Sequence, residues 1–359
     1  MKYSIVLTGG GTAGHVTPNL ALVPYLKKEG FEISYVGSLN GIEKSLVEAQ
    51  GIEYSGIATG KFRRYFDVKN FTDPFRVMKG FMQARRLLRA KKPDVVFSKG
   101  GFVAVPVVRA AASLKIPCII HESDMTPGLA NRLCIPVADK VCCNFPETFD
   151  MIPPQKAVLT GAPIRDELLH GDAERGRKFT GFTDDKPVIM VIGGSQGSAA
   201  VNGAIRDSLG ELLKDFNIVH ITGKDKQDNM LLTVDGYKQY EYLTDELPDL
   251  FAMADVVVSR AGAGALGEVL ALRKPNLLIP LPSASSRGDQ ILNARSFEEQ
   301  GFSMVISEED MTSSLLVRKI RELYENRESY VKAMTESPQK DAIGAIMKLI
   351  LDEVSDLKK

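Results

Sequence analysis

Residues 2–19 read KYSIVLTGGGTAGHVTPN, in which an apolar run leads directly into a glycine-rich turn. The run Ile5–Leu7 predicts a buried strand, and Pro18, after the glycines, predicts the first turn of a helix. Glycines let the backbone approach a ligand closely, while a first helical turn presents unpaired N–H groups and a positive dipole end. The stretch is therefore predicted to attract phosphate.

A near-copy of this opening follows about half a chain later. Residues 187–202 read PVIMVIGGSQGSAAVN, which is again an apolar strand, a glycine turn and a helix start. The chain has 359 residues, of which 44% are hydrophobic, so it can fill two cores. One half is thus predicted to repeat the architecture of the other.

Short apolar runs alternate with helical patterns in both halves, which favours parallel sheets with helices on both faces. A last helically periodic stretch, Ile343–Leu357, has no strand after it and must pack on structure already formed. Two such domains imply a cleft, with ligands at the carboxyl ends of both sheets. The expected strands are Ile5–Leu7, Ile33–Val36, Val95–Phe97, Cys118–Ile120, Lys140–Cys143, Val188–Ile192, Ile218–Ile221, Val256–Ser259, Asn276–Ile279 and Met304–Ile306.

Charge is distributed unevenly although the formal net charge is zero. Residues 1–163 hold 21 Lys and Arg against 13 Asp and Glu, whereas the remainder holds 24 against 32. The basic half is a candidate for contact with a membrane surface, a phosphorylated substrate or nucleic acid. Nucleic acid is not expected, because no RNA- or DNA-binding motif is present.

Targeting and redox signals point to the cytoplasm. No apolar run approaches a membrane span, and the N-terminus lacks a signal-peptide layout. None of the cysteines forms a C-x-x-C pair, so buried free thiols are expected. They are Cys118, Cys134, Cys142 and Cys143.

A dinucleotide site and a metal clamp are both disfavoured. Gly9, Gly11 and Gly14 match G-x-G-x-x-G, but the second strand ends in Gly37-Ser38 and not in the acid that would hold a ribose. Neither glycine turn carries the Lys-Ser/Thr of a P-loop, and no Asp-x-Asp occurs anywhere. No cofactor and no protein-bound metal are therefore predicted.

A third signal lies in residues 259–294, SRAGAGALGEVLALRKPNLLIPLPSASSRGDQILNA. Arg260–Gly264 predicts a tight small-residue turn after a strand, which would admit a phosphate to the next helix. Glu268, near the start of that helix, can accept two ribose hydroxyls. The alternative for Glu268 is a solvated first-turn acid that the helix dipole favours.

Six motifs in register carry a family resemblance: GGGTAGHVTP, SKGGFVAVP, HES-x-x-x-x-G-x-x-N, GAPIR, GGSQG-x-x-x-x-N and GAGALGE…DQ-x-x-NA. From Leu7 to about Ala294 the chain resembles the MurG family. The resemblance implies the GT-B fold, with two Rossmann-like, doubly wound parallel-sheet domains facing across a cleft. The expected parts are an N-terminal domain 1–162, a C-terminal domain 163–340, and a helix 341–359 that packs back on the first domain.

The activity implied is inverting transfer of GlcNAc from UDP-GlcNAc to the MurNAc 4-hydroxyl of undecaprenyl-pyrophosphoryl-MurNAc-pentapeptide, lipid I to lipid II, in peptidoglycan synthesis. In such a transfer the leaving diphosphate would be stabilised by helix N-termini, backbone N–H groups and Arg165. Other readings stay open: another GT-B enzyme such as a nucleotide-sugar 2-epimerase, or a non-catalytic sugar-nucleotide-binding protein.

The resemblance also assigns site residues. Leu243 would contact uracil through its backbone, and Gln290 the GlcNAc hydroxyls. Asp124 stands where many members have Asn. The acceptor diphosphate would meet Gly11, Gly14, Gly100 and Gly101. The expected donor contacts are Thr12, Ala13, Gly14, Asp124, Arg165, Ser195, Leu243, Ala263, Gly264, Ala265, Leu266, Gly267, Glu268 and Gln290.

Proton transfer requires a general base. His15 follows the first glycine turn, and imidazole suits proton transfer near neutral pH. His121 and Glu122, at a strand end, are the alternative candidates for the base, or a pair that binds the acceptor. We predict His15 and Glu122 as the catalytic residues.

Membrane contact is predicted for one basic, amphipathic helix. No acidic residue lies between Asp73 and Asp94, and the segment between them holds seven cations. Such a helix can lie on an anionic bilayer, although it can equally be a crossover helix with a solvated basic face. A lipid-linked acceptor favours peripheral binding to anionic inner-leaflet lipids on the cytoplasmic face of the membrane. The residues expected at that face are Phe75, Phe81, Arg85, Arg86 and Arg89.

Overall fold

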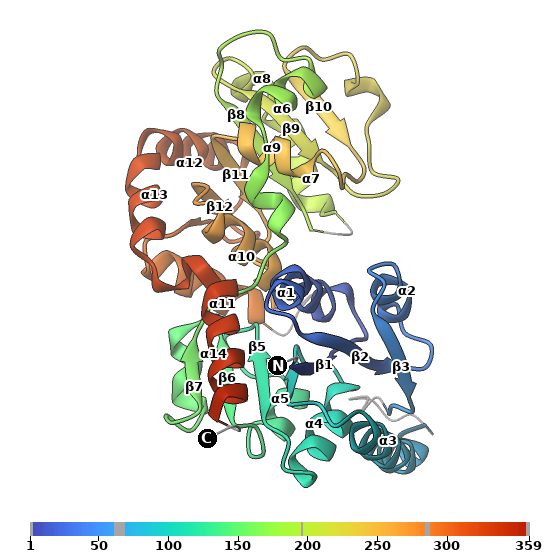
Figure 1. Cartoon of the computed structure of the whole chain (residues 1–359). Helices are drawn as coiled ribbons and strands as arrows, with labels where there is room; N and C mark the ends of the chain where they lie inside the picture. The colour runs from blue at the N-terminus through green and yellow to red at the C-terminus, as the bar shows by residue number, and fades with distance from the viewer. Residues whose placement is uncertain (1–2, 61–68, 195–196, 284–287, 357–359) are drawn as a thin grey trace. The chain divides into compact units, whose positions relative to one another are not determined.

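The computed structural model describes residues 3–60, 69–194, 197–283 and 288–356. It divides into two compact units, Met1–Arg165 with Asp341–Lys359, and Asp166–Lys340 (Figure 1). The predicted boundary after residue 162 lies three residues too early. The chain stays bonded to the first sheet beyond its last strand, because the Gly161 amide donates to the Cys143 carbonyl and the Gly161 carbonyl bonds to His121.

The first unit is built on a seven-stranded sheet in the order β3-β2-β1-β4-β5-β6-β7, with every pair parallel. Parallel strands need crossover connections, and helices supply most of them. The strands are β1 (Ser4–Thr8), β2 (Glu32–Ser38), β3 (Glu53–Ile57), β4 (Val95–Ser98), β5 (Cys118–Glu122), β6 (Lys140–Cys143) and β7 (Ala157–Leu159). The helices are η1 (Ala13–His15), α1 (Thr17–Lys28), α2 (Glu43–Glu48), α3 (Lys69–Lys91), α4 (Ala104–Ser113), α5 (Leu129–Cys134), η2 (Pro146–Met151) and α14 (Ala342–Asp356).

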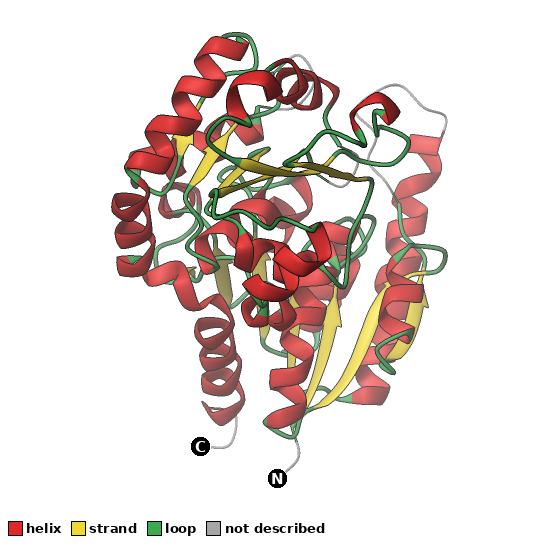
Figure 2. Ribbon diagram, turned by 90° about the horizontal axis from the view of Figure 1, so that it is seen from above, coloured by secondary structure: helices red, strands yellow, loops and turns green. Residues whose placement is uncertain are grey.

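Both faces of this sheet are covered. Successive side chains of a strand point to opposite faces, so Ile5 and Leu7 join one buried cluster while Val6 joins the other. Helices accordingly lie on both sides of the strands (Figure 2). The four predicted free cysteines are buried in this unit, which confirms that part of the sequence analysis.

The last helix, α14, belongs to the first unit although it follows the whole of the second. Ile343, Ile346, Ile350 and Val354 share a buried cluster with Leu22 of α1. Their spacing of three or four residues places them on one face of the helix. Figure 1 shows this helix in red beside elements of the first unit.

The second unit repeats the strand order of the first, as β10-β9-β8-β11-β12-β13, again with every pair parallel. In both units, the order in which successive strands are added to the sheet therefore reverses between the first strand and the fourth. The strands are β8 (Val188–Ile192), β9 (Asn217–Ile221), β10 (Tyr237–Tyr240), β11 (Val256–Ser259), β12 (Asn276–Leu278) and β13 (Met304–Val305). The helices are η3 (Asp166–His170), α6 (Ala173–Thr180), α7 (Ala199–Asp207), α8 (Leu209–Leu212), η4 (Asn229–Leu231), α9 (Leu247–Met253), α10 (Ala263–Ala271), α11 (Asp289–Glu299), α12 (Ser313–Glu325), α13 (Arg327–Glu336) and η5 (Pro338–Asp341).

The predicted fold class, two doubly wound parallel sheets, is confirmed. Three strands were not predicted from the sequence, and each forms an edge of its sheet: β3, β7 and β10. An edge strand has a neighbour on one side only and needs no continuous apolar run. The segments EYSGI and YKQY carry polar residues and gave no such signal.

Candidate active site

The carboxyl ends of the parallel strands define the candidate site in each unit. In open sheets of this kind, ligands bind where the strand order reverses. That point lies between β1 and β4 in the first unit and between β8 and β11 in the second. Each of these four strands is followed by a glycine-containing turn, at Gly9, Gly100, Gly193 and Gly262.

The first glycine turn is closely packed at Gly9 and open at Gly11. A Cβ atom on Gly9 would come within 2.5 Å of the His15 carbonyl oxygen, whereas one on Gly11 would meet nothing within 4 Å. Gly11 has a φ of 89°, which only glycine adopts readily. Thr12, Ala13 and Gly14 follow as exposed residues, so the predicted donor and acceptor contacts here are accessible.

Glu43, which was not predicted as a site residue from the sequence, accepts a hydrogen bond from this turn. Its Oε2 accepts the Gly11 amide at 3.3 Å, while Oε1 accepts the Ser38 amide at 2.8 Å and the Ser38 hydroxyl at 2.5 Å. Burial raises the pKa of the Glu43 carboxyl, but hydrogen bonds from Ser38 and Gly11 outweigh it and leave the pKa below its ordinary value. The signal in the sequence was an acid five residues beyond β2, past the strand end at which a dinucleotide site would keep its ribose acid.

His15 ends the first glycine turn as a half-buried side chain. Its Nδ1 lies 3.2 Å from the Gly10 carbonyl oxygen and 3.1 Å from the Thr12 hydroxyl. A carbonyl oxygen only accepts, so the contact with Gly10 places the proton on Nδ1 and the lone pair on Nε2. Burial and the Lys99 ammonium lower the pKa of His15 to about 4, which keeps the ring neutral at physiological pH.

Glu122 is buried and fully engaged within its own loop. Its Oε1 accepts the amides of Ser123 and Asp124, and its Oε2 accepts the Gly128 amide and the Asn131 side chain. Burial raises the pKa of this carboxyl although these hydrogen bonds oppose the rise. The arrangement suits a residue that shapes the loop after β5 rather than one that takes a proton from a substrate.

Lys99 is a second residue that the sequence analysis passed over, although it lies in the quoted SKGG motif. It is 2% exposed and donates from Nζ to the Ser123 hydroxyl. Burial lowers its pKa to about 8, against the pull of Glu122 and Asp124, so it remains charged near pH 7. The following Gly100 and Gly101, with φ of 90° and 84°, bring this turn against Gly10 and Asn131.

The remaining histidines do not fit a catalytic role. His121 is fully buried and bonds through Nε2 to the Gly161 carbonyl at 2.9 Å. His220 is equally buried between Tyr237 and Asn202. His170 is exposed and contacts Asp166 in η3.

In the second unit, α10 begins at a turn without side-chain obstruction. Its N-cap is Gly262, which has no side chain to cap the helix, and a Cβ on Gly262 or Gly264 would meet nothing within 4 Å. Ala263 and Ala265 are half-buried at this turn, while Leu266 and Gly267 are buried behind it. The turn therefore leaves room for the phosphate that the sequence predicts there.

The other predicted donor residues are spread over several segments. Glu268 is half-buried on α10, and Gln290 in the first turn of α11 accepts the Leu281 amide at 3.0 Å. Leu243 follows β10 and is half-buried, as are Asp124 after β5 and Arg165 at the end of the first unit. Ser195 lies outside the described residues.

Helix α3 divides its apolar residues between the core and solvent. Gly80, Ala84 and Leu88 are buried, and Phe81, predicted for a membrane face, packs partly buried against the core. Arg85 is also half-buried. The outer face instead shows Phe75, Met78 and Met82, which are 79%, 63% and 57% exposed. Exposed cations adjoin them at Lys79, Arg86 and Arg89.

No three His, Cys, Asp or Glu side chains in the described segments are grouped as metal ligands. Across those same segments, no helix combines the length and apolarity needed to cross a bilayer.

Two family models match the chain. The glycosyltransferase family 28 N-terminal domain matches residues 5–143, and the glycosyltransferase family 28 C-terminal domain matches residues 188–350. The chain belongs to glycosyltransferase family 28. A curated relative from Lachnospira eligens is 58% identical over 97% of this chain and 98% of its own length. Its name is UDP-N-acetylglucosamine--N-acetylmuramyl-(pentapeptide) pyrophosphoryl-undecaprenol N-acetylglucosamine transferase.

Solved structures agree with the family 28 assignment. MurG of Acinetobacter baumannii is 27% identical and superposes with a TM-score of 0.78 over 98% of this chain and 99% of that one. A putative UDP-N-acetylglucosamine 2-epimerase from Listeria monocytogenes is 14% identical, with a TM-score of 0.72 over 99% and 98%, and shares the fold alone. The resemblance to the MurG family, the GT-B fold class and a hexosyltransferase activity are thereby confirmed.

Proposed function

We propose that the enzyme transfers GlcNAc from UDP-GlcNAc to the MurNAc 4-hydroxyl of undecaprenyl-pyrophosphoryl-MurNAc-pentapeptide, with release of UDP. The observation that carries the proposal is the 58% identity, over 97% of the chain, to a relative named for this activity. Glycine turns at the carboxyl ends of both sheets support it, since donor and acceptor each carry a diphosphate.

In the proposed reaction the acceptor oxygen attacks the anomeric carbon of α-linked GlcNAc. A new C–O bond forms on one face of that carbon, while the bond to the UDP oxygen breaks on the other, which gives a β-1,4 linkage. The hydroxyl proton passes to Nε2 of His15, whose Nδ1 is already protonated toward Gly10. Glu122 shapes the neighbouring loop and takes no proton.

The donor would bind at the second unit. Amides in the first turn of α10 would stabilise the charge that develops on the leaving diphosphate, with no protein-bound metal. Glu268 would accept the ribose hydroxyls, and Gln290 would contact the sugar. Arg165 would add positive charge near the donor.

The acceptor would bind at the first unit. Gly11, Gly14, Gly100 and Gly101 would surround its diphosphate, since the turns that contain them lie at the end of the sheet beside the buried charge of Lys99.

The lipid tail of the acceptor requires contact with a membrane. The exposed face of α3, with Phe75, Met78 and Met82 beside Lys79, Arg86 and Arg89, has the composition of a peripheral membrane surface. Anionic lipids of the inner leaflet would attract these cations, each of which contributes about 1 kcal/mol near the surface. The enzyme would then act at the cytoplasmic face of the membrane.

The decisive experiment supplies purified enzyme with UDP-GlcNAc and a short-chain lipid I analogue. Release of UDP together with one new disaccharide-linked lipid is expected only when both substrates are present. A nucleotide-sugar 2-epimerase, which shares the fold, would form the 2-epimer of the donor without acceptor. Epimer formation, or the absence of any disaccharide product, would overturn the proposal.

A further inference from the structure

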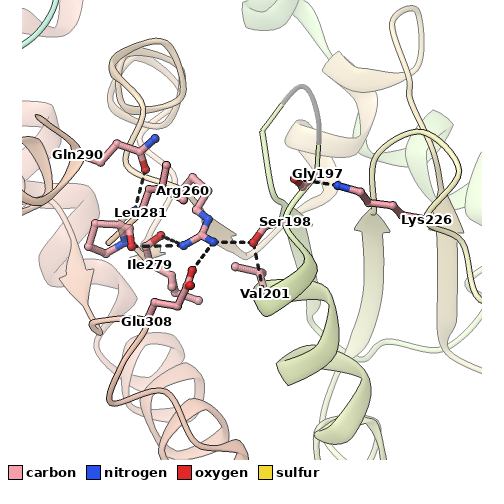
Figure 3. Close-up of polar contacts among 10 residues, drawn as sticks. Gly197, Ser198, Val201, Lys226, Arg260, Ile279, Leu281, Gln290 and Glu308 are labelled. Carbon is pink, nitrogen blue, oxygen red and sulfur yellow. Dashed lines mark hydrogen bonds and ion pairs between the residues drawn. The ribbon is translucent and has the colours of Figure 1, made fainter. Parts of the chain in front are cut away.

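The guanidinium of Arg260 joins separate segments at the carboxyl end of the second sheet (Figure 3). Arg260 follows β11 directly and is 8% exposed. Its Nη1 donates to the carbonyls of Ile279 and Pro280, at 3.0 and 3.3 Å. Its Nη2 donates to the Ser198 hydroxyl at 2.6 Å and forms an ion pair with Glu308.

These contacts occupy both terminal nitrogens of Arg260. Each terminal nitrogen carries two N–H groups, and each has two protein acceptors. The charge is balanced by Glu308, which is itself largely shielded from solvent. A guanidinium committed in this way is poorly placed to bind a ligand phosphate and well placed to hold loops.

Ser198, which accepts a hydrogen bond from Arg260, directly follows the second glycine turn. Its Oγ also accepts the Val201 amide at 3.3 Å and so caps the N-terminus of α7. On the other flank, Lys226 donates to the Gly197 carbonyl at 3.3 Å. Gly197 itself packs so closely on the end of β9 that a Cβ would lie 1.9 Å from the Thr222 carbonyl oxygen.

The same guanidinium is also linked, through the segment at Pro280, to Gln290, the predicted contact of the sugar. Pro280, one of its acceptors, directly precedes Leu281, and the Leu281 amide donates to Gln290 at the start of α11. A single side chain thus connects the first turn of α7, the turn before α10 and the segment that orients Gln290.

We propose that Arg260 is a positioning residue for the donor: it fixes these segments in the register that the diphosphate and the sugar of UDP-GlcNAc require. The proposal rests on the proposed function, because it needs a sugar nucleotide at this edge of the sheet. A displacement of about 1 Å in such a support can cost about a hundredfold in rate or binding.

The test compares steady-state kinetics for donor and acceptor in a small set of variants. Arg260→Lys keeps the charge but loses the planar fork. It is expected to raise the KM for UDP-GlcNAc about tenfold or more, to weaken UDP binding in calorimetry equally, and to leave the acceptor KM within about twofold. Arg295→Gln, in the exposed Arg295–Glu299 pair on α11, is the matched control and should change neither KM.

Ser198 variants show whether Arg260 acts through the α7 turn. Ser198→Ala should reproduce part of the rise in donor KM, and Ser198→Thr, which keeps a hydroxyl, should restore the parent value. In the double variant, Ser198→Ala should add little to Arg260→Lys. If Arg260→Lys does not fold, the comparison of Ser198→Ala with Ser198→Thr still tests whether this hydrogen bond positions the donor.

Two results would overturn the inference: a folded Arg260→Lys enzyme with the parent's donor KM, or equal losses for donor and acceptor. Both differ from failure of the proposed function, in which the parent enzyme itself would form no disaccharide product.

Discussion

The Oε2 atom of Glu43 lies 3.3 Å from the amide nitrogen of Gly11, although the two residues are 32 positions apart. Glu43 also accepts the amide and hydroxyl of Ser38, so one buried carboxylate joins the ends of β1 and β2. A Cβ on Gly10 or Gly41 would come within 2.6 Å of this carboxylate. The first glycine turn therefore depends on a side chain outside its own motif.

Glu43→Gln should destabilise the first unit at neutral pH, because a neutral amide makes weaker hydrogen bonds than a carboxylate. The expected cost is about 1–3 kcal/mol, or a fall in Tm of several degrees. Because the folded pKa lies below the ordinary value of 4.5, the parent's advantage is complete above the unfolded pKa and is lost as pH falls through the folded pKa. Thermal unfolding of both proteins between pH 7 and pH 3 measures this; a constant difference would contradict it.

His15→Gln should lower kcat by about a hundredfold to ten-thousandfold if His15 is the base. With a pKa of about 4, the acidic limb of kcat/KM in the parent should fall near that value and not near 6.5. The measurement is a pH–rate series at saturating acceptor. Glu122→Gln is the comparison. If this variant, and not His15→Gln, loses the acidic limb of the pH profile, Glu122 is the general base.

Lys99→Met should move that acidic limb upward toward the ordinary histidine value, because the Lys99 charge helps to hold the His15 pKa down. Methionine has a similar length and suits the buried site. The same pH–rate series provides the measurement, and an unmoved limb would show that Lys99 does not act on the base.

Glu268→Gln should raise the KM for UDP-GlcNAc by about tenfold to a hundredfold, since charge-assisted hydrogen bonds to the ribose would be lost. UDP affinity measured by calorimetry should fall by a similar factor. Glu299→Gln, at an exposed acid of the same unit, is the control. Unchanged donor kinetics in Glu268→Gln would remove this residue from the site.

Membrane binding should depend on the outer face of α3. Arg86→Glu with Arg89→Glu should weaken binding to anionic vesicles in a sedimentation assay, and salt should weaken the parent likewise. Turnover of a soluble, short-chain acceptor should be spared. Lys178→Glu with Lys332→Glu makes the same charge change on exposed residues of the second unit and should bind like the parent. If both double variants bind anionic vesicles equally well, the outer face of α3 is not the membrane-binding surface.

Catalysis should not require a divalent cation, because amides at helix N-termini are proposed to stabilise the leaving diphosphate. Exhaustive chelation should leave disaccharide formation at a comparable rate. Activity that is abolished by chelator and restored only by Mg²⁺ or Mn²⁺ would contradict the proposed mechanism.

The order of short apolar runs and glycine turns was sufficient to predict two parallel sheets and the turns that end their inner strands. Such patterns are local: a buried strand needs an apolar run, and a close backbone approach needs glycine at that position. The edge strands β3 and β10 gave no such signal, because their segments EYSGI and YKQY are interrupted by polar residues, and β7 has only the three apolar residues AVL.

The supports of the site became visible only in the tertiary structure. Glu43 and Gly11, or Arg260 and Ser198, come together because strands distant in sequence end at the same edge of a parallel sheet. Tertiary packing also turned Phe81 toward the core while leaving Met78 and Met82 outside, although all three are apolar residues of one helix. Sequence determined which local elements form, since propensity and periodicity act over a few residues; burial and charge pairing depend on contacts across the fold and were decided there.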